Sequence, residues 1–255
     1  MPPVAANLAV TPHGRESFSD DALVEAFHRG DVQEAGPKIF CIGMQRSGTT
    51  STGDFCENQL GMVRRSNRVS RRRGWSRLWL TGEMETVFDD PVFRTGQMFD
   101  DGPWWFPGVY RLLHQRFPDA RFVMFVRDPE SWFNSLSAHS RGRSPGYTDV
   151  HARIYGREEE FEELQRAHGG SLAADHRNGF SLEGQAERYM RVYEEHVRSV
   201  ATYFRDNAPD HFFSAPLDDP EKFRKLAVFL GFPDREYEDV RSSVIVGRRP
   251  ERADN

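Results

Sequence analysis

The sequence predicts an α/β fold in which a parallel sheet is flanked by helices. Two short apolar runs, at 38–43 and 121–126, have the composition of buried strands, and each is followed at once by a polar loop. Patterns typical of helices alternate with these runs, and such alternation favours a parallel sheet covered on both faces. The length of 255 residues suits a single domain of ordinary size.

The remaining elements follow in chain order. A helix at about 108–117 precedes the second strand, and Pro118 helps to end it. A long helix at about 182–207 carries one stripe of aromatic and apolar side chains, which indicates core packing. After a short strand at 211–215, an N-cap and a proline begin a last helix at 218–231.

Composition divides the chain into segments. Residues 1–36 are polar, and we expect an N-terminal extension there, with the domain itself spanning 37–255. The stretch 139–180 is rich in glycine and charge and interrupts the alternation of strands and helices. Because long loops in compact domains are often functional, we expect it to be an insertion or a lid over the site.

Composition also excludes several classes of protein. No apolar run approaches the length of a membrane span, and the N-terminus lacks the features of a signal peptide, so no membrane contact is expected. Cys41 and Cys56 are too few for a disulfide framework or a zinc site, so we expect no metal and a reducing cytoplasm. A net charge of −5 argues against nucleic acid as a partner. A homodimer is compatible with all of these features.

A glycine-rich loop indicates an anion site. Gly43 and Gly48 are separated by four residues, after a buried strand and before a helix expected at about 49–60. Backbone N–H groups, hydroxyl groups and the positive end of the helix dipole together cradle a phosphate in such a loop, which makes the predicted sheet P-loop-type. A nucleoside-triphosphate loop has a lysine after the second glycine, whereas here Thr49 follows it and the cation is Arg46. An ordinary kinase or ATPase is therefore less favoured.

A second group of residues follows the strand at 121–126. Arg127 stands at the carboxyl edge of the predicted sheet, where open α/β folds bind ligands. Ser135 lies eight residues later, about two turns along a helix that starts after Pro129. Loop and helix are therefore expected to hold one anionic group together.

These motifs resemble those of the sulfotransferases. The loop at 43–50 is similar to the family's 5′-phosphosulfate loop, and Arg127 with Ser135 is similar to its 3′-phosphate motif. The resemblance implies a metal-independent enzyme that moves a sulfuryl group from 3′-phosphoadenosine 5′-phosphosulfate (PAPS) to a hydroxyl or amine. The donor-binding residues that it implies are Gln45, Arg46, Ser47, Gly48, Thr49, Thr50, Ser51, Arg127 and Ser135.

The sequence departs from the family pattern at three points. Gln45 replaces the usual proline, and Arg46 stands where many members have lysine. The glycine-rich basic loop that completes the 3′-phosphate site in eukaryotic cytosolic members has no counterpart in the sequence. Arg248 and Arg249 are the candidates to replace it.

The resemblance also implies a general base that takes the acceptor's proton. Many members place a histidine two residues before a proline, and Asp101 has this offset from Pro103. Aromatic residues that follow would raise the pKa of this carboxyl. Arg46 and Asp101 are therefore the predicted catalytic residues, although Asp101 also suits a turn with Gly102. The alternatives for the base are Glu83, Glu85 and His114.

Seven arginines fall within residues 64–77, and they leave three interpretations open. They are Arg64, Arg65, Arg68, Arg71, Arg72, Arg73 and Arg77. They would form a solvated basic loop, bind an anionic acceptor, or close over the donor. Trp75 and Trp79 would suit a flat or sugar-like acceptor. The expected acceptor is a small molecule or glycan, anionic or aromatic; the alternatives to a sulfotransferase are a P-loop small-molecule kinase and an inactive nucleotide-binding protein.

Overall fold

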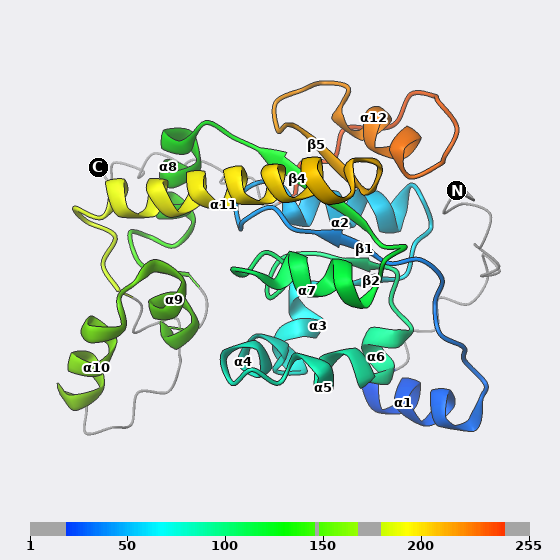
Figure 1. Ribbon diagram of the computed structural model, residues 1–255, viewed down its shortest axis with the longest axis horizontal. Helices are drawn as coiled ribbons and strands as arrows, with labels where there is room; N and C mark the ends of the chain where they lie inside the picture. Colours follow the sequence, from blue (N-terminus) through cyan, green and yellow to red (C-terminus); the bar gives the residue numbers. More distant parts are fainter. Residues whose placement is uncertain (1–18, 146–147, 168–179, 243–255) are drawn as a thin grey trace, which may run out of the picture.

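The computed structural model describes residues 19–145, 148–167 and 180–242. They form a five-stranded sheet in which all neighbouring strands are parallel. In spatial order the strands are β2 (Arg64–Arg65), β3 (Met98–Phe99), β1 (Ile39–Cys41), β4 (Arg121–Val126) and β5 (Phe212–Pro216) (Figure 1). The sequence predicted β1, β4 and β5 but not β2 and β3, because two residues are too few for a hydrophobic pattern.

Helices surround the sheet and pack against one another. In chain order they are α1 (Asp20–Arg29), α2 (Thr49–Asn58), α3 (Asn67–Arg72), α4 (Trp75–Leu80), α5 (Met84–Asp89), α6 (Pro91–Arg94), α7 (Val109–Arg116), α8 (Pro129–His139), α9 (Thr148–Tyr155), α10 (Glu158–Ala167), α11 (Ala186–Asn207), the 3₁₀ turn η3 (Pro209–His211) and α12 (Lys222–Phe229). The helices predicted from the sequence correspond to α2, α7, α8, α11 and α12. The four short helices α3 to α6 fill the connection between β2 and β3, where the sequence showed no long pattern.

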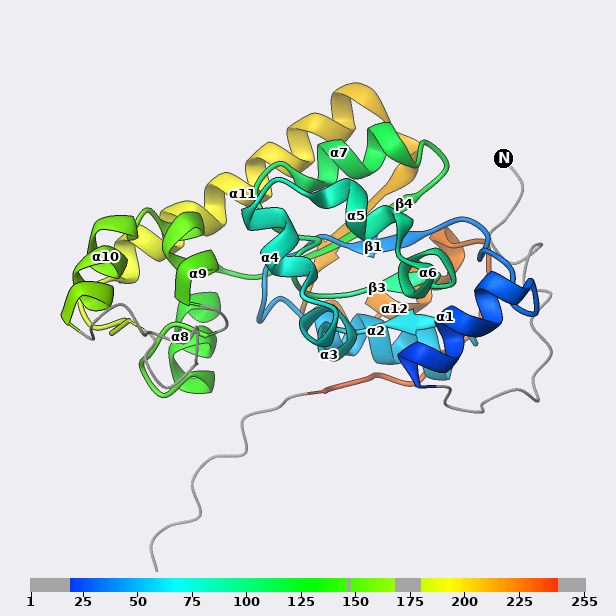
Figure 2. The same ribbon diagram turned by 90° about the horizontal axis from the view of Figure 1, so that it is seen from below.

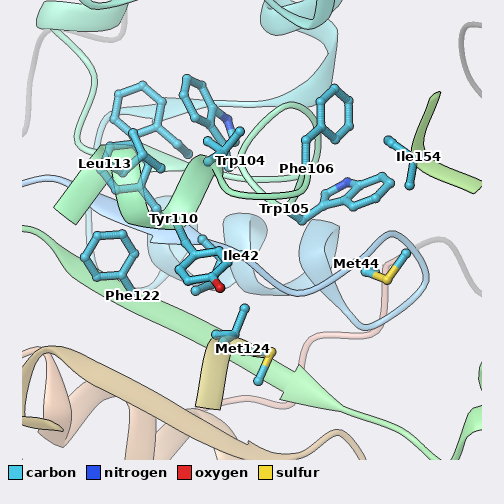
Figure 3. Close-up of a cluster of buried hydrophobic side chains, with 14 of the residues drawn as sticks. Ile42, Met44, Trp104, Trp105, Phe106, Tyr110, Leu113, Phe122, Met124 and Ile154 are labelled. Atoms are coloured by element: carbon cyan, nitrogen blue, oxygen red, sulfur yellow. The ribbon is translucent and has the colours of Figure 1, made fainter. Parts of the chain in front are cut away.

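Alternate residues of the central strands face opposite sides of the sheet, so the sheet has two cores. Phe40 and Phe122 belong to a larger cluster that includes side chains of α7 and α11, and Cys41 and Val123 belong to a smaller one with side chains of α2 and α12. Figure 2 shows these helices in layers on opposite sides of the sheet. Figure 3 shows Tyr110 of α7 beside Phe122 in the larger cluster. Burial of both faces confirms the predicted α/β class.

Two segments that differ in composition from the domain pack against it. α1 lies against α6, and its Asp20 pairs with Arg72 of α3. Within 139–180, the described residues form the helices α9 and α10, not an open loop (Figure 1). α9 contacts α4 and α11, so it is anchored to the domain and can supply a wall to a site.

α11 is the longest of the described helices and is amphipathic. Its buried side chains are Tyr189, Tyr193, Val200 and Phe204, and the first three belong to the stripe that the sequence indicated. Its other faces carry charged residues.

Across 19–145, 148–167 and 180–242, the structure contains no helix with the length and apolarity of a membrane span.

Candidate functional site

The loop between β1 and α2 turns sharply into the helix. Arg46 and Gly48 both have left-handed backbone angles, with φ of 68° and 80°. This region of φ favours glycine, and a Cβ at Gly48 would also lie 2.5 Å from Leu217 Cδ1. α2 begins at Thr49, and the first turn of a helix leaves its backbone N–H groups without partners inside the helix. The loop therefore presents amide groups and the positive end of a helix dipole at one place.

Side chains from distant elements hold the loop. The indole Nε1 of Trp132 donates to the Gln45 carbonyl at 2.8 Å, and Arg127 Nη1 donates to the Arg46 carbonyl at 3.1 Å. The Gln45 side-chain amide donates to Tyr155 Oη at 3.2 Å. The loop is thus tied to α8, to the end of β4 and to α9, which fixes its shape before any ligand binds.

The predicted second anion site lies beside the loop. Arg127 follows β4, and Tyr193 of α11 holds its backbone by accepting from the amide at 2.8 Å and donating to the carbonyl at 3.2 Å. Asp128 caps α8 by accepting from Ser131 N at 2.8 Å, and this cap orients the helix that carries Ser135. Arg46 Nε donates to Ser135 Oγ at 3.2 Å. The two predicted motifs therefore meet.

A cavity of about 1210 Å³ opens on these residues. It contains seven of the predicted donor-binding residues, Arg46, Gly48, Thr49, Thr50, Ser51, Arg127 and Ser135. Its far wall consists of the residues after β5 and the segment 239–242, which the sequence did not indicate. Gln45 and Ser47 do not line this cavity: Gln45 lines a second one, and the loop residue Ser47 is buried. Arg248 and Arg249 lie outside the described residues.

The second cavity, of about 450 Å³, lies on the other side of the loop. It shares Arg46, Thr49 and Thr50 with the first. Its remaining walls come from the loop between β1 and α2, the loop after β3, α3, α4, the end of α8, the segment between α8 and α9, and α9 itself. They are Gln45, Asn67, Arg71, Ser76, Asp101, Gly102, Trp105, Phe106, His139, Ser140, Ser144, Pro145, Val150, His151 and Ile154.

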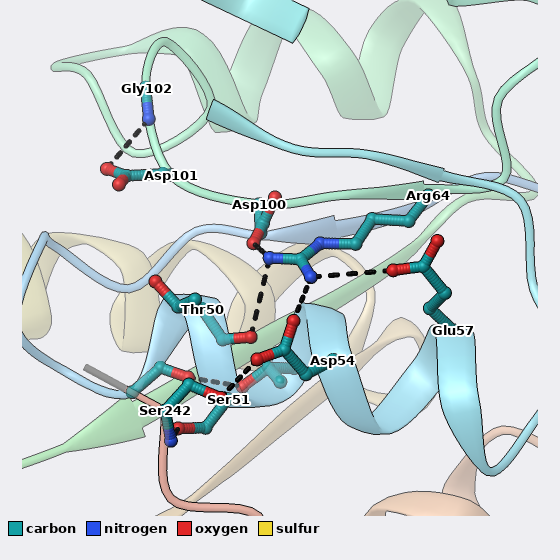
Figure 4. A network of polar contacts seen from close by, with 11 residues as sticks. Thr50, Ser51, Asp54, Glu57, Arg64, Asp100, Asp101, Gly102 and Ser242 are labelled. Atoms are coloured by element: carbon teal, nitrogen blue, oxygen red, sulfur yellow. Dashed lines mark hydrogen bonds and ion pairs between the residues drawn. The ribbon is translucent and has the colours of Figure 1, made fainter. Parts of the chain in front are cut away.

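Asp101 lies in this second cavity with its carboxylate held in place. Its φ of 65° is left-handed, and its Oδ1 accepts from Gly102 N at 3.0 Å and from Trp105 Nε1 at 3.2 Å (Figure 4 shows the first contact). Burial raises the pKa of Asp101, while these two hydrogen bonds and the positive charge of Arg46 oppose the shift. The geometry suits a carboxylate that accepts a proton inside a partly dry cavity.

His139 is a site residue that the sequence analysis missed. Its Nδ1 lies 3.4 Å from Arg46 Nη1, and because a guanidinium only donates, this nitrogen is the acceptor and the proton is on Nε2. Burial and the Arg46 charge lower the pKa of His139, while Asp101 opposes the shift. His139 stands four residues after Ser135 on α8, so helical spacing from the predicted motif was the signal that could have found it.

The three alternatives for the base lie elsewhere. Glu83 accepts from Thr81 Oγ1 at 2.8 Å at the start of α5, and Glu85 is exposed, 3.5 Å from Arg116. His114 Nδ1 lies 2.9 Å from Tyr203 Oη, between α7 and α11. None of the three lines either of the two cavities.

The arginine-rich segment is an ordered part of the domain that contains β2, α3 and α4. Arg64 is nearly buried and pairs with Asp54 of α2 and with Asp100, while Ser242 donates to Asp54 from the opposite side (Figure 4). Burial raises the pKa of Asp100 to about 7 against the opposing effect of Arg64. This network joins α2 to β2, to β3 and to the segment that lines the larger cavity.

Four further arginines of the segment also have protein partners. Arg65 donates to the Val92 carbonyl and to Thr95 Oγ1, and the other pairs are Arg72 with Asp20, Arg73 with Asp90 and Arg77 with Asp149. Of the seven arginines, all of which the structure describes, Arg71 is the one that lines a cavity of the site. The segment is therefore ordered strand and helix and not a loop, although Arg68, Arg71, Arg72 and Arg77 are exposed to solvent.

The comparison with protein families identifies the domain. A sulfotransferase domain family model matches residues 38–240, which is most of the chain. The chain belongs to this family. The solved structures that match the sulfotransferase domain include a sulfotransferase from Alicyclobacillus acidocaldarius, with 15% sequence identity over 83% of this chain and 87% of that one and a TM-score of 0.46. No curated protein matches the sequence.

Within the described residues, no group of three or more His, Cys, Asp or Glu side chains is placed to hold a metal ion.

Proposed function

We propose that this sulfotransferase moves the sulfuryl group of PAPS to a hydroxyl group of a small-molecule acceptor. The observation that carries the proposal is that the two cavities meet on Arg46, Thr49 and Thr50. A donor in the larger cavity and an acceptor in the smaller one would face each other across these residues. Such an arrangement suits transfer of a group from one ligand to the other.

The chemistry of the larger cavity fits the donor. PAPS carries two separate anionic groups, the 5′-phosphosulfate and the 3′-phosphate. The loop amides, the start of α2 and the hydroxyls of Thr49 and Thr50 suit the first group. Arg127 and Ser135 suit the second, because a guanidinium and a hydroxyl both donate to phosphate oxygens.

The reaction requires positioned charge more than covalent help from the protein. The acceptor oxygen attacks sulfur, the bond between sulfur and the phosphate oxygen breaks, and 3′-phosphoadenosine 5′-phosphate (PAP) leaves. By analogy with phosphoryl transfer, negative charge builds on the leaving phosphate oxygen. Arg46 is placed to neutralise that charge, because Ser135 and His139 hold its guanidinium where the two cavities meet.

Asp101 is the proposed base. It would take the proton that the acceptor hydroxyl loses as its oxygen bonds to sulfur. The hydrogen bonds from Gly102 and Trp105 occupy Oδ1, which leaves Oδ2 as the proposed proton acceptor.

Cys41 and Cys56 are buried free thiols, and this supports the proposal that the enzyme works in a reducing compartment such as the cytoplasm.

Calorimetry with two nucleotides tests the donor. PAP is expected to bind without magnesium and to raise the melting temperature, whereas ATP with magnesium is expected to bind much less tightly, because the loop has Thr49 in place of the triphosphate lysine. Tighter binding of magnesium ATP would favour the kinase alternative.

Incubation with ³⁵S-labelled PAPS and a metabolite extract then tests transfer, and PAP binding with no labelled product would favour an inactive nucleotide-binding protein.

A further inference from the structure

Among the described residues, the smaller cavity is lined by more cationic than anionic side chains. Arg46 and Arg71 line it, and Asp101 is the carboxylate among its described lining residues. Burial and the nearby Arg157 lower the pKa of His151 to about 3, so this residue is neutral. The described side chains therefore place an excess of positive charge around an acceptor.

The backbone at Arg71 is held close to the proposed base. The preceding residue, Ser70, is buried and donates from Oγ to the Gly102 carbonyl at 2.7 Å. Gly102 directly follows Asp101, so this bond joins α3 to the loop that carries the carboxylate. Asn67 stands four residues before Arg71, on the same face of α3, and also lines the cavity. The guanidinium and an amide thus stand together at one wall.

A second wall is aromatic and apolar. Trp105 and Phe106 are each 5% exposed and pack edge to face, with ring centroids 4.8 Å apart. Ile154 of α9 lies near them across the cavity, as Figure 3 shows. Hydrogen bonding of the Trp105 indole to Asp101 fixes the ring, so this wall is formed before a ligand enters.

We propose that the acceptor is a hydroxyl compound with a planar apolar body and an oxyanion, and that Arg71 binds the oxyanion. This inference rests on the sulfotransferase function proposed above and names the acceptor class. Trp105 and Phe106 contact the planar body, Asp101 faces the hydroxyl, and Asn67 assists Arg71. A positive side chain here also offsets the repulsion that an anionic acceptor meets from the negatively charged donor.

Three probes of similar size test the charge: 4-hydroxyphenylacetate, its methyl ester and 4-hydroxyphenethylamine. Dissociation constants are measured by calorimetry on the full chain, with and without PAP, so the readout does not depend on turnover. The carboxylate is expected to bind tightest and the amine weakest. In Arg71→Ala, affinity for the carboxylate is expected to fall about tenfold while affinity for the ester stays within a factor of about two. A parallel series with 4-hydroxyphenyl phosphate distinguishes a carboxylate from a phosphate as the preferred oxyanion.

Two variants control the measurement. Arg68→Ala removes an exposed arginine of the same helix that lines neither cavity, and it is expected to change nothing. Arg71→Lys keeps the charge without the fork and is expected to restore part of the affinity. Equal binding of carboxylate and ester, equal losses for both in Arg71→Ala, or binding of none of the probes would overturn the inference. Failure of PAP to bind would instead contradict the proposed function, whatever the probes do.

Discussion

Arg46 Nε donates a hydrogen bond to Ser135 Oγ at 3.2 Å, joining residues that stand 89 positions apart in the chain. One comes from the loop after β1 and the other from the second turn of α8, so the bond connects the two proposed anion sites. His139 lies one turn further along α8, and its Nδ1 accepts a hydrogen bond from Nη1 of the same guanidinium. The cation of the loop is therefore oriented from outside the loop.

Arg46→Ala is expected to lower turnover by about a hundred- to a thousandfold, the usual effect of removing one preorganised donor to a transition-state charge. The melting temperature is expected to change little, because alanine also occupies the left-handed backbone position and the side chain lies in a ligand cavity. Turnover with labelled PAPS and a thermal melt measure both. Arg46→Gly relieves the backbone strain, and it should be as inactive as Arg46→Ala. Near-normal turnover in both variants would contradict the proposed mechanism.

Arg127→Ala is expected to weaken binding of PAP by about ten- to a hundredfold, because a charge-assisted contact with the 3′-phosphate is lost. AMP lacks that phosphate and should lose less. Its affinity is not expected to remain fully intact, since Arg127 Nη1 also holds the Arg46 carbonyl. Calorimetry with the two nucleotides separates the contributions. Equal losses would mean that Arg127 acts only by shaping the loop.

Asp101→Asn is expected to abolish transfer and leave PAP affinity intact, because only the acceptor's proton involves this carboxyl. In the wild type, kcat/KM should rise with pH as Asp101 ionises. Because burial raises its pKa, the midpoint of this rise should lie above that of an ordinary aspartate. Glu85→Gln, at an exposed residue outside both cavities, serves as the control and should remain active. Retained turnover in Asp101→Asn would remove Asp101 from the mechanism.

His139→Asn is expected to keep most activity, because the amide oxygen can replace Nδ1 as the acceptor for Arg46 Nη1. His139→Ala should reduce kcat without changing the acid limb of the pH profile, which we assign to Asp101. In the wild type, protonation of His139 would remove the acceptor for Arg46, and its pKa is lowered, so this loss should occur only below the usual range of histidine. An acid limb that disappears in His139→Asn would instead identify the histidine as the base.

Gly53→Ala is expected to destabilise the protein, although alanine favours a helix by about 1 kcal/mol over glycine. The added Cβ would lie 2.4 Å from Arg64 Nε and 2.5 Å from Asp100 Oδ2, in a network that has little room to move. Displacing that network would cost about 1 to 3 kcal/mol of unfolding free energy, as overpacking usually does. Denaturant titration measures the change. Asn58→Ala, at an exposed position of the same helix, should be near neutral, and a stabilised Gly53→Ala would show that the network yields easily.

The structure distinguishes what local sequence patterns can predict from what they cannot. β4 and the loop at 43–50 were predictable because each is contiguous: six residues make a strand, and two glycines with a helix behind them make an anion cradle. β2 and β3 were not predictable, since two residues carry no period and these strands exist only through their parallel neighbours. The arginine-rich segment was misleading for the same reason, because the carboxylates that pair with Arg64 come from α2 and from the residue that follows β3.

The sequence alone determined the order of the main strands and helices, the chemistry of both anion motifs and the sulfotransferase resemblance, since each depends on residues close together in the chain. Only the tertiary structure decided that Arg46 is held between Ser135 and His139, that Asp101 rather than His114 or the two glutamates faces a cavity, and that Arg71 is the arginine of its cluster beside that cavity. Those relationships join separate elements of the fold. They are set by how α3, α8 and the loop after β3 pack around the sheet, and no spacing along the chain encodes such packing by itself.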